Sequence, residues 1–283
     1  TFTGDIGRPQ DSILRSPEPF PQADYIICES TYGDRQHEPH SDMKAHLLRI
    51  VHDTCVERRG KLLIPAFAVD RTQELIYAFD QLSSEGKLPR LPVYIDSPLA
   101  VRATRVMQEN SDYFNPDILD YIEKDGDAFA FPYLHYISDV ADSKALNGRD
   151  EPCIIISSSG MAEAGRIKHH IRNNVEDPST TILIVGYSAP NTLGGALKRG
   201  DKEVRIFGET VPVRARVEVM DSFSAHGDYN EMIDYLSCQD PARVRQVFLV
   251  HGEYETQIAF KLKLEKVGFR KVHIPALYES VTL

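Results

Sequence analysis

The sequence has little cysteine and no long apolar run, and both shortages exclude whole classes of protein. The four cysteines lie far apart, so there is no CxxC pair of the kind that zinc fingers and redox motifs use. Cys28 and Cys153 lie inside apolar runs, which is typical of buried free thiols in a reducing cytoplasm. No apolar stretch is long enough to span a bilayer, and no basic start leads into an apolar segment as in a signal peptide. We therefore expect a cytoplasmic location.

Basic residues are also scarce relative to acidic ones. The 283-residue chain has 32 Lys and Arg against 42 Asp and Glu, a net charge of −10. Such a chain is not a general nucleic-acid coat, because that function depends on positive charge, but it can still carry a local basic groove. Residues 155–216 carry nine Lys and Arg against six acids, which fits either a groove of this kind or an ordinary solvated surface.

The remaining composition is that of a globular protein. Apolar residues make up 42% and charged residues 26%, which excludes a disordered or fibrous chain, and the length suggests about two domains. Short apolar strands alternate with longer helices, a pattern that predicts an α/β fold with a mainly parallel sheet. We expect strands at 23–29, 62–64, 92–96, 153–156, 181–185 and 247–250, a hairpin within 203–220, and helices at 41–59, 70–82, from 98, after 160, after 228 and at 254–267. Asp70 with Gln73 indicates a capping box, and Ser97 before Pro98 indicates a helix cap.

Small polar residues and glycine directly follow several of these strands. In parallel sheets, ligands bind at the carboxyl ends of the strands, so these residues are candidates for a site. Five such clusters stand out, at 3–5, 29–33, 157–161, 222–228 and 251–253. Any one of them alone has an ordinary explanation as a turn or a helix cap. Together, Asp5, Glu29, His226 and His251 offer carboxylates and imidazoles, which are suited to zinc. A carboxylate beside an imidazole also favours the charged imidazole, so such a pair makes a general acid.

The same clusters resemble the motifs of the β-CASP nucleases of the metallo-β-lactamase fold. Thr3-Gly4-Asp5 resembles the fourth metal motif, whose Asp bridges two zinc ions. Glu29 in Glu-Ser-Thr-Tyr-Gly matches motif A, His226 in Ser-Phe-Ser-Ala-His matches motif B, and His251 in Val-His-Gly-Glu matches motif C, whose His ligates zinc. Runs at 64–74, 96–100 and 186–194 also resemble family signatures, so the resemblance covers nearly the whole chain in order.

Two metal motifs of the family are missing from this sequence. The third-motif His is absent, since no His precedes Asp5. The first metal motif of the family, His-x-His-x-Asp-His, has no counterpart, and the spacing of His37 and His40 is more typical of a polar loop. Asp5 and His251 alone cannot supply the ligands of two zinc ions. We therefore expect this chain to be the carboxyl part of a longer enzyme, with zinc bound weakly or not at all by the chain alone.

The resemblance also implies an architecture. Residues 1–33 and 208–283 would belong to an αββα metallo-β-lactamase domain. Residues 34–207 would form an inserted Rossmann-like β-CASP domain, a parallel sheet flanked by helices, which leaves a cleft for single-stranded RNA.

A phosphate site is expected after the strand at 153–156. Ser157, Ser158, Ser159 and Gly160 form a turn that leads to a helix N-terminus, where backbone N–H groups can bind a phosphate or can simply be capped. We assign these four residues and Arg166 to RNA phosphate binding, while His169 and His170 are as consistent with a plain surface as with RNA contacts.

The leading hypothesis is a zinc-dependent RNA nuclease. In it a metal-bound hydroxide attacks the phosphodiester, Asp5 and His251 ligate metal, and His226, oriented by Glu29, protonates the leaving oxygen. The alternatives are a non-catalytic RNA-binding or scaffold subunit of the same fold and a metallo-hydrolase of small esters. A homodimer is left open.

Overall fold

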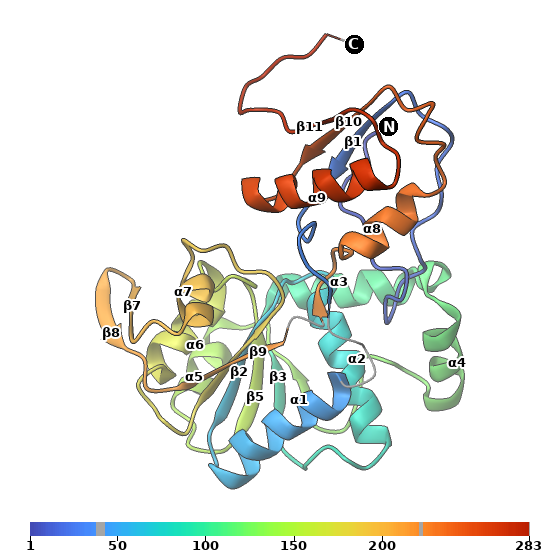
Figure 1. The fold of residues 1–283 in the computed structure, drawn as a ribbon. Helices are drawn as coiled ribbons and strands as arrows, with labels where there is room; N and C mark the ends of the chain where they lie inside the picture. Colours follow the sequence, from blue (N-terminus) through green and yellow to red (C-terminus); the bar gives the residue numbers. More distant parts are fainter. Residues whose placement is uncertain (38–42, 221–222, 283) are drawn as a thin grey trace. The chain divides into compact units, whose positions relative to one another are not determined.

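The computed structural model describes residues 1–37, 43–220 and 223–282. The chain forms two compact units, one made of Thr1–His37 with Ala225–Leu283 and the other of Glu38–Ser224 (Figure 1). His40 and Ser222, which the sequence analysis named, lie outside the described residues. No helix in the described part of the chain has the length and apolar character that crossing a bilayer requires.

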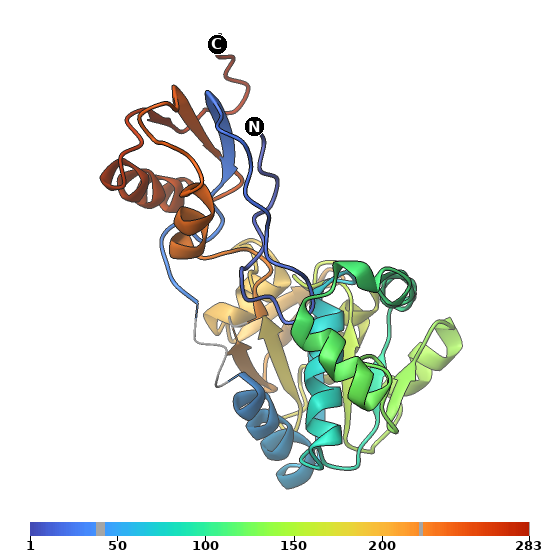
Figure 2. The same ribbon diagram turned by 90° about the vertical axis from the view of Figure 1, so that its right-hand side faces the viewer.

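The smaller unit contains a three-stranded parallel sheet in the order β1-β10-β11. Its strands are β1 (Tyr25–Glu29), β10 (Gln246–Val250) and β11 (Val272–His273), and its helices are α8 (Tyr229–Leu236) and α9 (Tyr254–Lys266). Every second residue of the strands packs on the helices: Ile26, Cys28 and Leu249 join one core with Met232 and Phe260. Figure 2 shows α9 alongside this face of the sheet.

The other face of the small sheet is apolar and partly open. Ile27 of β1 is exposed, and so is Phe2, which forms a parallel bridge with Ile27. All-parallel sheets are usually covered on both faces. One sheet with helices on one side is half of an αββα sandwich, as the resemblance implies.

The larger unit is built on a six-stranded, wholly parallel sheet in the order β4-β3-β5-β2-β6-β9. The strands are β2 (Lys61–Pro65), β3 (Val93–Ile95), β4 (Leu134–Tyr136), β5 (Cys153–Ser157), β6 (Thr181–Val185) and β9 (Arg216–Met220). The central strands β2, β5 and β6 are buried along their whole length, because helices cover both faces.

Helices flank this sheet on two sides. α5 (Val140–Asn147), α6 (Gly165–Asn174) and α7 (Leu193–Arg199) share a core with one face, and the hairpin of β7 (Glu203–Ile206) and β8 (Glu209–Pro212) packs there too. α1 (Met43–Val51) and α2 (Arg71–Ser84) lie on the other side in Figure 1. The remaining helical segments are η2 (His52–Glu57, a π-helical turn), α3 (Pro98–Glu109), η3 (Ser111–Tyr113) and α4 (Pro116–Asp125).

Most expected elements are confirmed, and three details are corrected. Asp70 makes no capping hydrogen bond because its φ of 69° lies outside the extended region that a side-chain cap needs. The helix after Gly160 begins only at Gly165, so the serine turn does not lead directly into its first turn. Only part of 203–220 is a hairpin, since β9 pairs with β6 instead.

The compact units have other bounds than the domains that the resemblance implies, because contacts and family motifs divide a chain by different criteria. Residues 208–220 contact the larger unit, since β9 forms the edge of its sheet, whereas residues 34–37 contact the smaller unit. The metallo-β-lactamase segments 1–33 and 208–283 and the β-CASP segment 34–207 stay predictions.

Gly60, between η2 and β2, offers a test of this packing. A Cβ atom at Gly60 would lie 1.9 Å from the carbonyl oxygen of Ser179, so Gly60→Ala has to shift backbone and should destabilise the protein by about 1–3 kcal/mol. Gly148→Ala is the control, because its Cβ would meet nothing closer than 3.8 Å. Urea unfolding of both variants measures the difference, and equal stability of the two would contradict the packing.

Candidate metal and acid–base centre

Four predicted site residues come together in the smaller unit. Glu29 is the last residue of β1, and His251 follows the last residue of β10. The parallel register pairs Glu29 with Val250, so both strands end at the same edge. Asp5 follows a segment that runs along β1, and His226 forms an antiparallel bridge with Gly7.

Two glycines allow these segments to approach closely. A Cβ at Gly252 would lie 2.6 Å from Ser30 Oγ and 2.8 Å from its carbonyl oxygen, and a Cβ at Gly33 would lie 2.4 Å from Cβ of Phe260. The Ser30 hydroxyl also donates to the carbonyl oxygen of Val250, at 2.7 Å. Only glycine at these positions lets the loops after β1 and β10 pack against their neighbours.

His251 has an unusual backbone. Its φ is 52°, in the left-handed region that residues with a Cβ rarely adopt. Strain of this kind persists where the surrounding structure imposes it, and it concentrates at functional sites. The conformation brings His251 Nδ1 to 3.3 Å from Asp5 Oδ1.

Glu29 and His226 form a buried acid–base pair. His226 Nδ1 lies 2.9 Å from Glu29 Oε2 and 3.1 Å from Oε1. The Glu29 side chain is 1% exposed, whereas that of His226 is 21% exposed. The carboxylate therefore fixes the proton on Nδ1 of His226, so Nε2 is the ring nitrogen that Glu29 does not bond.

Several donors keep Glu29 charged. Burial by itself would raise the pKa of Glu29, but hydrogen bonds from His226, Thr31 and the backbone N–H of Ile6 outweigh it and hold the pKa below its ordinary value. A buried carboxylate with this many donors is a stable negative charge. It is suited to stabilising a charged imidazole beside it.

Three of the four residues also form a group of possible metal ligands. One ligand atom from each of Asp5, His226 and His251 lies within 4.8 Å of the others. One carboxylate and two imidazoles are a donor set typical of zinc, and catalytic zinc sites use three protein ligands with an open position. The residues present therefore fit one zinc ion. His226, which the sequence analysis assigned only to proton transfer, is thus also a candidate ligand.

The chain after His226 is held by a capped helix. Asp228 is the N-cap of α8 and forms a capping box with Glu231, and Glu231 pairs with Arg8 at 3.2 Å. The N–H of Gly227 donates to the carbonyl oxygen of Ile6 at 2.8 Å. These contacts make the loop around His226 a fixed part of the smaller unit.

The predicted phosphate-binding turn lies in the larger unit, and its side chains have protein partners. Ser157 donates to the carbonyl oxygen of Asp96, Ser158 pairs with Ser97 at 3.0 Å, and Ser159 bonds with Ala164. A Cβ at Gly160 would lie 2.6 Å from the Phe67 ring, so the turn is closely packed there.

Arg166 is held by a buried carboxylate. Its Nη1 lies 2.6 Å from Asp96 Oδ1, and its Nη2 donates to the carbonyl oxygen of Ser138. His170 Nε2 lies 2.7 Å from the other oxygen of Asp96, and His170 is fully buried rather than on the surface. Arg166 thus serves first as the partner of Asp96, at the strand end next to the serine turn.

Two residues near the centre did not emerge as site candidates from the sequence. The Thr31 hydroxyl lies 2.6 Å from Glu29 Oε2 and 3.0 Å from the carbonyl oxygen of His251, so it joins the two strand ends. Its position two residues after Glu29 is a signal that could have found it. His37 lies against the same centre, and burial lowers its pKa, but nothing in its local sequence pointed to a partner 189 residues away.

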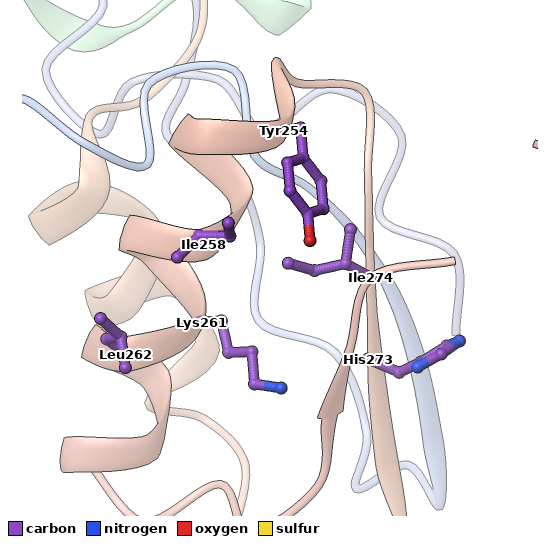
Figure 3. A pocket seen from close by; sticks show the side chains of 6 residues that line it. All are labelled: Tyr254, Ile258, Lys261, Leu262, His273 and Ile274. Carbon is purple, nitrogen blue, oxygen red and sulfur yellow. The ribbon is translucent and has the colours of Figure 1, made fainter. Parts of the chain in front are cut away.

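A separate pocket of about 320 Å³ lies beside α9 and the end of β11. It is lined by Tyr254, Ile258, Lys261, Leu262, His273 and Ile274 (Figure 3). None of the four candidate site residues is among them. The acid–base centre is therefore not this pocket but a cluster at the strand ends.

Comparison with known proteins agrees with this fold. The family model of the Beta-Casp domain matches residues 72–197, and that of the Zn-dependent metallo-hydrolase RNA specificity domain matches residues 210–275. The chain is 36% identical over 259 residues to Ribonuclease TTHA0252 of Thermus thermophilus, covering 91% of this chain and 58% of that protein. It is 31% identical to an RNase J-like protein of Methanocaldococcus jannaschii, and the match covers 94% of this chain and 61% of that protein. It is also 31% identical to transcription termination factor FttA of Methanosarcina mazei, and that match covers 93% of this chain and 43% of the relative.

The fold and the matched domains define an α/β protein of the metallo-hydrolase type, in which part of an αββα domain carries an inserted Rossmann-like domain. The chain belongs to the β-CASP family of the metallo-β-lactamase fold. It spans about 43–61% of the length of these curated relatives.

The Asp96 network gives a stability prediction. Burial by itself would raise the pKa of Asp96, but hydrogen bonds from His170, Ser143 and Arg166 hold it below its ordinary value. Asp96→Asn leaves Arg166 without its counter-charge and should cost about 3–5 kcal/mol of the free energy of unfolding at neutral pH.

The pH dependence follows from the direction of this shift. A lowered folded-state pKa stabilises the protein above the unfolded pKa of about 3.9, and this contribution disappears as the pH falls through the folded value. Urea unfolding at several pH values should show the gap between wild type and Asp96→Asn closing in acid. The exposed Asp112→Asn is the control, and a loss no larger than the control's would contradict the network.

Proposed function

We propose that the full-length protein is a zinc-dependent ribonuclease that hydrolyses phosphodiester bonds of single-stranded RNA in the cytoplasm. The observation that carries the proposal is the Glu29–His226 pair beside the possible ligands Asp5 and His251. The names of the ribonuclease and RNase J-like relatives and the RNA specificity domain support RNA as the substrate. The expected homodimer stays a prediction.

The metal would be held by Asp5 and His251, with further ligands from other parts of the full-length protein. A bound zinc ion would supply Lewis-acid activation of water and of the phosphoryl oxygens. We keep two ions in the full-length enzyme as a prediction, because the description of the RNA specificity domain supports zinc without giving a count.

The proton for the leaving oxygen would come from His226. An alkoxide is a poor leaving group unless it is protonated, and an imidazole titrates near neutral pH. Glu29 holds Nδ1 and stabilises the charged ring, so Nε2 can give its proton to the leaving oxygen. In the larger unit, the Ser157–Gly160 turn would contact the RNA phosphates, with Arg166 orienting the turn through Asp96.

Two other functions fit the fold less well. A non-catalytic RNA-binding or scaffold subunit has no need of a buried carboxylate that fixes the tautomer of a partly exposed histidine. A metallo-hydrolase of small esters has no need of the RNA specificity domain. Kinetics of the full-length protein separate all three.

Zinc titration tests the proposed ligand set. By calorimetry, this chain should bind zinc weakly, because its described residues bring together only three donors, two of them exposed. His251→Ala should remove the residual binding, and His52→Ala, an exposed histidine of η2, should not. Tight binding of two zinc ions by this chain, or unchanged binding by His251→Ala, would refute the ligand assignment.

The role of His226 is tested in the full-length enzyme. His226→Ala should keep its zinc and lose about 10²–10⁴-fold in rate, the usual contribution of a general acid. Glu29→Gln should lose a smaller factor and move the alkaline limb of the pH–rate profile to lower pH, because a neutral amide no longer stabilises the imidazolium.

The outcomes of that experiment separate the two roles of His226. Loss of zinc from His226→Ala by metal analysis would make His226 a ligand instead of the acid. Cleavage at the normal rate would remove it from the mechanism. His52→Ala again serves as the control for replacing a histidine.

A further inference from the structure

His37 contacts the chain around His226 at two points. Its Nε2 lies 2.9 Å from the carbonyl oxygen of His226, and its backbone N–H donates to Asp228 Oδ2 at 3.1 Å. The ring packs on Tyr32, with 4.5 Å between ring centroids. Tyr32 is itself three residues from Glu29, so His37 connects the segment after β1 to the loop of His226.

The chemistry of these partners defines the tautomer of His37. A carbonyl oxygen only accepts hydrogen bonds, so Nε2 must carry a proton. Nδ1 is buried and has no hydrogen-bond partner among the described residues. The arrangement therefore fits a neutral ring with its proton on Nε2, because a proton on Nδ1 would be an unpaired buried donor.

We infer that His37 is a positioning residue for His226. Glu29 holds the side chain of His226 through Nδ1, and His37 holds its backbone through the carbonyl oxygen. Fixing both ends leaves little freedom to the ring, so Nε2 keeps one direction. The inference deepens the proposed function and rests on it for its effect on RNA cleavage.

The hydrogen bond from His37 Nε2 to His226 can be removed without disturbing the cap that holds the loop. Oδ1 of Asp228 caps α8 by accepting from the N–H groups of Asn230 and Glu231, and it does so without His37. The bond from His37 to Asp228 uses the backbone N–H, which any residue but proline retains. Replacing the His37 side chain therefore removes the bond to His226 and leaves the cap in place.

Two substitutions isolate the Nε2–H donor. His37→Phe keeps a ring against Tyr32 and removes the donor. His37→Gln removes the ring and places an amide N–H about where Nε2 stood. His52→Phe, at an exposed position of η2, is the matched control.

The first measurement needs no RNA. Nitrogen-15 NMR of histidine-labelled chain should show His37 as the Nε2–H tautomer. In His37→Phe the ring signals of His226 should shift, while thermal unfolding stays close to that of wild type. A proton on Nδ1 of His37, or unmoved His226 signals in His37→Phe, would overturn the inference.

The second measurement uses the full-length enzyme with single-stranded RNA. His37→Phe should lower kcat by about 10–100-fold, comparable to losing a hydrogen-bond partner of a metal-ligating histidine, with KM unchanged. His37→Gln should recover part of the loss, and His52→Phe should match wild type. Equal loss in both His37 variants would show that the ring, not the donor, matters and would refute the inference. Absence of cleavage by the wild-type enzyme would refute the proposed function instead, and the NMR result would still decide the role of His37.

Discussion

The burial of one carboxylate organises the smaller unit. Glu29 is buried at the end of β1, and a charge withdrawn from water needs hydrogen bonds and opposite charge around it. Those donors come from three parts of the chain: the backbone at Ile6, the hydroxyl of Thr31 and the ring of His226. The hydrogen bonds to Glu29 therefore bring together the chain segments that carry other residues of the centre. The need to compensate a buried charge thus also fixes the geometry of the site.

The larger unit uses the same device. Asp96 is fully buried at the end of β3 and draws in Arg166 and His170 from α6 and Ser143 from α5. Each unit thus has a negative charge at a strand end that ties helices and loops to its sheet. The histidine beside the charge is 21% exposed in the smaller unit (His226), whereas it is 1% exposed in the larger unit (His170).

The sequence predicted much of this because it depends on local pattern. Alternating strands and helices predicted the parallel sheet, and the position of Glu29 and His251 directly after strands predicted that they would meet at one edge. The structure brings Asp5 and His226 to the same place. Their positions after strands, together with the resemblance to family motifs, were enough to select these four residues, whose roles stay predictions.

The remainder depends on contacts between distant residues. The pairing of Arg166 with Asp96, the bond from His37 to His226 and the pairing of β9 with β6 leave no periodic trace in the sequence. Asp70 was predicted to cap a helix because its residue type and its spacing from Gln73 can be read from the sequence. Its backbone conformation, which prevents the cap, cannot be read from the sequence. Tertiary geometry decided each of these.

The bond between His37 and His226 also bears on how the larger unit is accommodated. These residues flank the whole stretch Glu38–Ser224, and they are joined at 2.9 Å within the smaller unit. For the smaller unit, that stretch is a loop whose two ends are already fixed together. The entropy cost of closing a loop rises only with the logarithm of its length, so a complete domain costs little more there than a long turn. Because the two chain segments are bonded to each other where they leave the smaller unit, this unit can carry a much larger insertion while its own strands stay in register.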